Sequence, residues 1–107
     1  MKKQVLETLK SISQIDDALY EIDFTNTFKK QLNLCFRRNL NLLLFEEVVK
    51  ILATKGRLPA KYLPHYIRQF DVMECHITPD WLLMWKQDDK KLILILTNTG
   101  THSDLFR

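Results

Sequence analysis

The sequence predicts an α+β domain in which a small antiparallel sheet packs against an N-terminal helical hairpin, with one extra helix at the N-terminus. Two observations lead to this prediction. Apolar residues recur with helical spacing through most of the first half of the chain, and strand-like alternation dominates from about residue 70. Runs of helices followed by runs of strands are typical of α+β folds. At 107 residues the chain suffices for one domain with a single core.

The first elements are an amphipathic helix and a strand. Residues 2–13 place four apolar side chains on one helical face, which predicts a short amphipathic helix. They are Val5, Leu6, Leu9 and Ile12. Residues 20–25 alternate between apolar and polar side chains, as in a half-buried strand. We therefore divide the chain into an N-terminal helical extension (1–18) and a main domain (19–107).

Two helices should follow this strand and form a hairpin that covers one face of the sheet. The apolar stripe of the first predicts a helix near 27–38, and that of the second predicts a helix ending at Lys55. Polar residues before each helix can accept hydrogen bonds from its first free N–H groups, and a glycine often ends a helix. The candidate caps are Thr25 or Asn26, Asn39 or Asn41, and Gly56.

The second half of the chain is predicted to form a loop followed by an antiparallel meander. Residues 57–68 contain two Leu-Pro pairs and should form a loop that carries His65. Strands are predicted at 70–76, 81–86 and 92–96, with a turn at 87–90. Leu92–Leu96 is apolar on both faces, which is typical of a central strand. The polar residues Thr97–Gly100 should leave that strand.

The composition limits the possible functions only weakly. The net charge of +3 is a mild preference for anionic partners and does not by itself identify a nucleic-acid binder. No apolar run is long enough to span a membrane and no signal-peptide core is present, so we expect a soluble, cytoplasmic protein. Cys35 and Cys75 fall in apolar patterns and should be buried thiols in a reducing compartment.

The chemistry-bearing residues gather at His65, His76, Asp80 and His102. Antiparallel strands return the chain to its starting edge, so His76 and His102 can share one site. Histidines with a carboxylate suit acid–base chemistry on a phosphodiester. On the residues alone, unrelated surface histidines and an Asp80 that caps a turn are the simpler interpretation. Zinc held by the histidines is a weaker option, because their spacing matches no compact ligand motif.

Three segments and His65 together resemble YafQ-type toxins of the RelE/ParE superfamily. They are Leu58–Tyr62 with His65, Glu74–Leu83 and Thr99–Phe106. The resemblance implies a RelE-like fold and a ribosome-dependent mRNA endoribonuclease that needs no metal or other cofactor. In such enzymes the 2′-hydroxyl attacks the adjacent phosphorus and leaves a 2′,3′-cyclic phosphate and a 5′-hydroxyl. The implied partners are a cognate antitoxin, the ribosome and mRNA, with DNA bound only through the antitoxin.

The resemblance also implies roles for single residues. The three histidines would transfer protons, Asp80 would be a base or would orient one, and the rings of Trp81 and Phe106 would shape the RNA pocket. Without the resemblance, Trp81 is more simply a core residue. The further RNA-binding candidates are Asn98, Arg68 and Lys86, with Arg107 as another possible cation.

Three departures from the family pattern qualify the prediction. Asn98 stands where the family usually has an arginine, and loss of a comparable transition-state donor costs about 10²–10³ in rate. The segment from His65 to His76 is short, and residues 1–18 lie outside the family pattern. Asn98 motivates an alternative function, a toxin-like protein that binds antitoxin or ribosome without efficient cleavage. Gyrase inhibition is a third hypothesis, against which the histidine-rich motifs argue.

Overall fold

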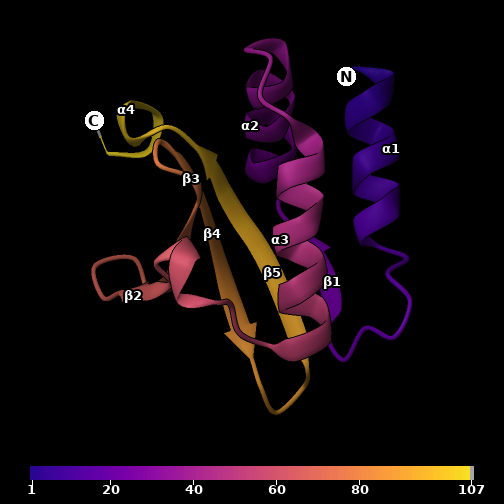
Figure 1. The fold of residues 1–107 in the computed structure, drawn as a ribbon, viewed down its shortest axis with the longest axis vertical. Coiled ribbons are helices and arrows are strands. Elements are labelled where there is room, and N and C mark those ends of the chain that lie inside the picture. The colour runs from indigo at the N-terminus through magenta and orange to yellow at the C-terminus, as the bar shows by residue number, and fades with distance from the viewer. Residues whose placement is uncertain (107) are drawn as a thin grey trace.

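The computed structural model describes residues 1–106, and its elements confirm the predicted α+β class. In chain order they are α1 (Lys3–Ile12), β1 (Glu21–Phe24), α2 (Asn26–Arg37), α3 (Leu42–Lys55), the 3-10 helix η1 (Ala60–Tyr62), β2 (His65–Ile67), β3 (Val72–Thr78), β4 (Trp81–Asp88), β5 (Ile93–Gly100) and α4 (His102–Leu105) (Figure 1). No helix within this part of the chain combines the length and apolar character needed to cross a membrane.

The five strands form one sheet in the order β1-β5-β4-β3-β2. Strands β3 to β5 make the predicted antiparallel meander, and β2 adds an antiparallel strand that was not predicted. Strand β1 pairs with β5 in parallel. The sheet is therefore mixed at one edge. A parallel pair needs a long crossover connection, and the chain supplies one because both helices of the hairpin lie between β1 and the meander. Strand β5 lies between β1 and β4, which explains its apolar residues on both faces.

Local capping explains where the helices of the hairpin begin and end. The Thr25 hydroxyl accepts a hydrogen bond from Phe28 N at 3.0 Å, and the Asn41 side chain accepts one from Leu43 N at 3.0 Å. Gly56 ends α3 with φ 71°, a left-handed conformation that favours glycine. A Cβ atom at this position would also lie 2.7 Å from the Tyr20 ring. Of the predicted capping residues, Thr25, Asn41 and Gly56 are therefore the ones that cap these helices.

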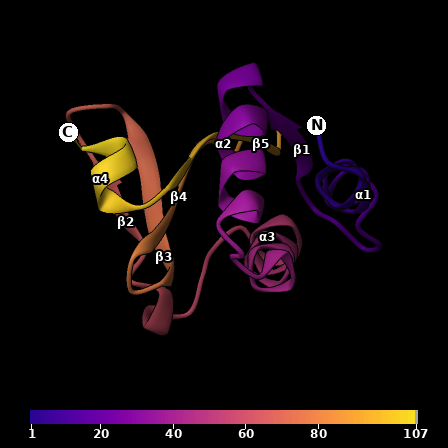
Figure 2. The same cartoon turned by 90° about the horizontal axis from the view of Figure 1, so that it is seen from above.

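The core lies between the helices and one face of the sheet. Figure 2 shows α2 and α3 between the strands β2 and β3 on one side and α1 on the other. The extension α1 packs mainly on α3, and Val5, Leu9 and Ile12 are buried in the same apolar cluster as the residues of the sheet. The predicted extension thus shares its core with the main domain. The largest buried side chains include Phe28, Phe45, Trp81 and Trp85.

Three sequence-based boundaries were wrong. His65 does not lie in a loop but begins β2, where it pairs with Glu74, and η1 precedes it. The strand expected at 70–76 runs from Val72 to Thr78, because the hydroxyl of Tyr66 donates to Asp71 at 2.5 Å and ties the turn that contains Phe70. Residues 97–100 continue β5, since a bulge opposite Met84 and Trp85 lets the ladder extend.

Candidate active site

Strand register gathers the candidate residues on the face of the sheet opposite the helices. Cys75, Leu83 and Trp85 belong to the core under the helices, so the alternate residues of β3 and β4 point to the other face. Directly opposite residues share a face. One row across four strands is His65, Glu74, Met84 and Asn98, and the next row is His76, Leu82 and Gly100.

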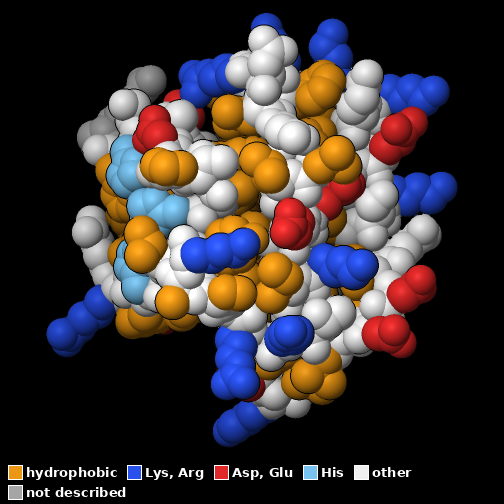
Figure 3. Space-filling view, in the orientation of Figure 1, with side chains coloured by type: hydrophobic (Ala, Val, Ile, Leu, Met, Phe, Trp, Pro, Cys, Tyr) orange, Lys and Arg blue, Asp and Glu red, His pale blue; other side chains and the backbone are white. Residues whose placement is uncertain are grey.

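The three histidines form a continuous row of rings with two phenylalanines. Ring centroids lie 6.4 Å apart for His65 and His76, and 5.6 Å apart for His76 and His102. The row continues from His102 to Phe106 at 6.3 Å and from Phe106 to Phe70 at 6.0 Å. Figure 3 shows the histidine side chains together on one side of the molecule. The structure thus brings together the three histidines that were predicted to share a site.

Asp80 orients His102. Its Oδ1 lies 2.8 Å from His102 Nδ1 and accepts the His102 backbone N–H at 3.2 Å. Hydrogen bonds from the His102 side chain and backbone lower the pKa of Asp80, so the carboxylate is an acceptor and Nδ1 carries the hydrogen. The Nε2 atom of His102 has no hydrogen-bond partner among residues 1–106. Because the hydrogen is on Nδ1, Nε2 carries a lone pair that points away from Asp80. His102 is exposed, so this nitrogen is accessible to a substrate.

His76 is held in a similar way. Its Nδ1 lies 3.3 Å from the carbonyl oxygen of Pro79, which can only accept a hydrogen bond. The hydrogen is therefore on Nδ1, and Nε2 has no partner among the described residues. His76 is half-buried and stands between the other two rings.

His65 differs because both of its ring nitrogens face oxygen atoms. Nδ1 lies 2.8 Å from the Leu63 carbonyl oxygen and must donate to it, while Nε2 lies 3.1 Å from Glu74 Oε1. Nε2 is therefore the contact between the ring and the carboxyl group, and neither ring nitrogen is free. Glu74 is only 4% exposed, and its Oε2 has no partner among the described residues. A buried carboxyl group in an apolar strand requires such a partner.

Glu74 was not among the predicted site residues. The available signal was its position two residues before His76, which places both on one face of a strand. What could not be seen from sequence is that β2 pairs with β3 and sets His65 directly opposite Glu74.

A second network anchors α4, which carries His102. Asp104 and Thr101 form a capping box, and the Arg38 guanidinium donates to both carboxylate oxygens of Asp104 at 3.0 and 2.8 Å. The hydrogen bond from the Thr101 backbone, and then the Arg38 guanidinium, lower the pKa of Asp104. Gly100 has φ 155°, and a Cβ atom there would lie 2.9 Å from Asp104 Oδ2. Only glycine lets this carboxylate fold back so closely.

The predicted RNA-contacting residues do not all lie where they were expected. Trp81 is 1% exposed and donates from Nε1 to the Thr99 hydroxyl at 2.9 Å, so its ring belongs to the core and offers no face to RNA. Period-two alternation places Trp81 on the helix-covered face, which is the physical reason for this correction. The other candidates are exposed or half-buried: Arg68, Lys86, Asn98 and Phe106. Arg107 lies outside the described residues.

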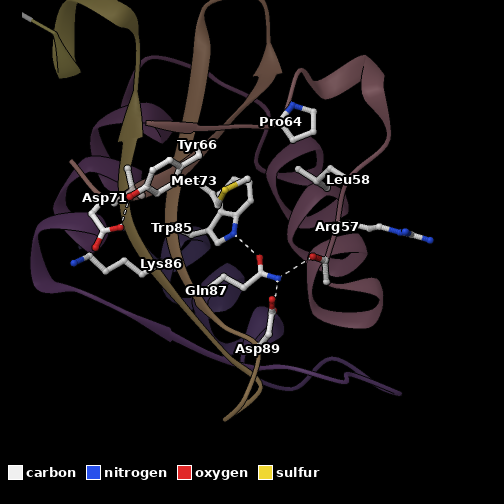
Figure 4. Close-up of a pocket in the computed structure, with 12 residues that line it drawn as sticks. Arg57, Leu58, Pro64, Tyr66, Asp71, Met73, Trp85, Lys86, Gln87 and Asp89 are labelled. Atoms are coloured by element: carbon white, nitrogen blue, oxygen red, sulfur yellow. Dashed lines mark hydrogen bonds between the residues drawn. The ribbon is translucent and has the colours of Figure 1, made fainter. Parts of the chain in front are cut away.

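A cavity of about 600 Å³ near the end of β4 is lined by no histidine. Figure 4 shows it between Leu58 and Pro64 on one side and the side chains of β4 on the other. The Gln87 amide in this cavity is already paired, since it donates to the Gly56 carbonyl at 2.9 Å and to Asp89 at 2.8 Å. In residues 1–106 no group of three or more His, Cys, Asp or Glu side chains is arranged to hold a metal ion.

Residues 20–107 match the sequence model of the family described as "Bacterial toxin of type II toxin-antitoxin system, YafQ". The chain belongs to this YafQ family. The match begins at residue 20, so α1 lies outside it.

Individual relatives agree with the family match. The mRNA interferase toxin YafQ of Escherichia coli BL21-DE3 is 29% identical over 89 residues, covering 80% of this chain and 95% of the relative. YafQ in the crystal structure of the E. coli DinJ–YafQ complex superposes with a TM-score of 0.75 at 27% identity, covering 82% of this chain and 99% of that one. A metal-bound toxin from Helicobacter pylori gives a TM-score of 0.73 at 34% identity, covering 79% and 97%.

Proposed function

We propose that this protein is a ribosome-dependent mRNA endoribonuclease that a cognate antitoxin holds inactive. The observation that carries the proposal is the row of three histidine rings on one open face, with His102 oriented by Asp80. The similar E. coli protein is named an mRNA interferase toxin, and that toxin has been crystallised with DinJ. The partners we propose are the antitoxin, the ribosome and mRNA, with DNA reached only through the antitoxin. The protein would act in the cytoplasm.

In this proposal, RNA itself supplies the nucleophile. The 2′-hydroxyl attacks the adjacent phosphorus, the 2′-O–P bond forms and the P–O5′ bond breaks. His102 Nε2 takes the proton of the 2′-hydroxyl, because Asp80 fixes the hydrogen on Nδ1 and stabilises the imidazolium that forms. His76, as the imidazolium, gives its Nε2 proton to the leaving 5′-oxygen, because that nitrogen has no partner in the described chain. His65, whose two ring nitrogens face protein oxygens, supports His76 from the neighbouring position in the row. No step requires a metal ion or cofactor.

The charge that develops on phosphorus needs positive groups nearby. Arg38 is held by Asp104, and Asn98 carries no charge. Arg68 and Lys86 are exposed, and neither forms an ion pair with another residue of the described chain, so we propose them as the cations that meet phosphate. The uncharged Asn98 keeps a second candidate open, a toxin-like protein that binds antitoxin or ribosome without efficient cleavage.

Mapping of RNA ends separates the two candidates. The protein is induced with and without its antitoxin, and 5′-hydroxyl ends and 2′,3′-cyclic phosphates are mapped on cellular mRNA. Growth arrest with new ends on translated mRNA supports the endoribonuclease, and His102→Ala should remove both. Arrest without new ends would exclude cleavage and favour the binding protein. If a missing charge limits the rate, Asn98→Arg should raise cleavage. If the wild-type protein cleaves strongly and Asn98→Arg does not cleave faster, other cations already stabilise the phosphate charge.

A further inference from the structure

A small cavity adjoins the histidine row on the same face of the sheet. Its volume is about 320 Å³, at the lower end of the range for small-molecule sites. We call it the Asn98 pocket. It is lined by Phe70, Val72, Met84, Lys86, Thr97, Asn98 and Leu105.

The register places the Asn98 pocket beside the reacting groups. Met84 is paired with Glu74 on one side and with Asn98 on the other, so Asn98 lies two strands from Glu74, or about 9–10 Å. The ring row gives a second connection, because Phe70 at the pocket contacts Phe106, which contacts His102. An RNA strand whose phosphate lies at the histidines would therefore bring a neighbouring nucleotide to this pocket.

The side chains of the pocket fit a nucleobase. The half-buried amide of Asn98 offers both a donor and an acceptor, and no other described residue hydrogen-bonds to it. Phe70 and Phe106 are 43% and 42% exposed, so a base can stack on either ring, while Lys86 can meet a phosphate. Met84 gives the pocket an apolar floor. By contrast, the amide of Gln87 in the 600 Å³ cavity is already fully engaged.

We propose that the Asn98 pocket binds one base of the RNA next to the cleaved bond, and that Asn98 is the residue that distinguishes bases there. An amide can form two hydrogen bonds to a base edge that presents a donor beside an acceptor. The absence of charge at Asn98 then has a function, because a cation would bind phosphates of every sequence equally. This inference rests on the proposed RNA-directed function of the same face.

Nucleotide binding tests the proposal without relying on cleavage. The four 3′-mononucleotides are titrated into ¹⁵N-labelled protein, and the Asn98 side-chain amide signal, assigned by its loss in Asn98→Ala, is followed by NMR. We expect this signal and the Thr97 and Thr99 backbone signals to shift, with affinities that differ among the four bases. The Asn98→Ala variant should bind all four alike, whereas Asn33→Ala on α2 should behave as wild type. Shifts confined to the histidines, or seen only with antitoxin, would overturn the proposal.

Cleavage profiles provide the second test. Wild-type protein should prefer certain bases beside the cut, and Asn98→Ala should reduce that preference by about 5- to 150-fold, the range for one well-formed amide–base pair. Lys86→Ala should instead weaken cleavage of all sequences alike, with Lys90→Ala as a matched control in an exposed turn. An unchanged preference in Asn98→Ala would overturn the proposal. Failure of wild type to cleave, together with base-selective NMR shifts, would contradict only the catalytic function.

Discussion

The two ends of strand β4 carry polar clusters that differ in how their hydrogen-bonding groups are used. Near its start lies the histidine row, and near its end lies what we call the Gln87 cluster. This cluster consists of Gln87, Trp85, Asp89, Tyr20 and the Gly56 carbonyl. Trp85 Nε1 donates to Gln87 at 3.0 Å, Gln87 donates to Gly56 and Asp89, and the Tyr20 hydroxyl donates to Asp89 at 2.6 Å.

The difference shows which cluster serves chemistry and which serves the fold. Members of the Gln87 cluster bond to one another and so join β4 to β1 and to the end of α3. In the histidine row, His76 and His102 each use Nδ1 for a structural contact and leave Nε2 without a partner in the described chain. Spare hydrogen-bonding capacity on an exposed face distinguishes a reactive site from a structural one.

The largest expected effect is that of His102→Ala. Removal of a proton-transfer group should lower the cleavage rate by about 10²–10⁴. Stability to urea should stay nearly the same, because the side chain of His102 is 53% exposed. Cleavage of a reporter mRNA on ribosomes and urea unfolding measure the two properties. An unfolded variant would mean that His102 is structural.

Gln87→Ala should give the opposite pattern. It leaves the Trp85 N–H and the Gly56 carbonyl without their partner, which costs about 1–3 kcal/mol of unfolding free energy. Cleavage per folded molecule should not change. Gln14→Ala, at an exposed position after α1, is the matched control and should be neutral. Loss of cleavage without loss of stability would break the distinction between the clusters.

Acid should weaken the anchor of α4. Because the pKa of Asp104 is lowered from its ordinary 3.8 in the folded protein, its contribution to stability is complete above about pH 4. That contribution is lost as pH falls further through the folded pKa. Urea unfolding of wild type and Asp104→Asn between pH 7 and 2.5 measures it. The variant should be less stable at pH 7, and the difference should shrink in acid; a constant difference would contradict the assignment.

The smallest expected effect is that of Tyr20→Phe. The variant loses the hydrogen bond from the Tyr20 hydroxyl to Asp89 and the one that this hydroxyl accepts from Gln87 at 3.4 Å. It keeps the ring against Gly56 and the other bonds of Gln87. The loss of unfolding free energy should therefore be smaller than for Gln87→Ala. The pKa of Tyr20 is raised, first by its hydrogen bond to Asp89, so spectroscopic titration offers a direct check. A normal tyrosine titration would contradict this contact.

Sequence reasoning was most accurate where local chemistry decides the structure. The helices could be predicted because their apolar periodicity and their capping residues lie within a few positions of each other, as at Thr25 and Gly56. The errors arose where distant segments decide. His65 joins a strand only because β3 offers it an edge, and β5 extends past residue 96 only because it bulges opposite Met84 and Trp85 of β4. Trp81 was assigned to an RNA pocket from a motif, although alternation along β4 turns it into the core.

The sequence by itself determined the α+β class, the helical hairpin, the burial of both cysteines and the resemblance that the family match confirmed. These follow from local spacing and composition. Only the tertiary structure decided that Glu74 pairs with His65 and that Asn98 lines a pocket beside the histidines. Both depend on strand register, which is set by packing across the whole sheet. A shift of the register by one residue would move each side chain to the other face.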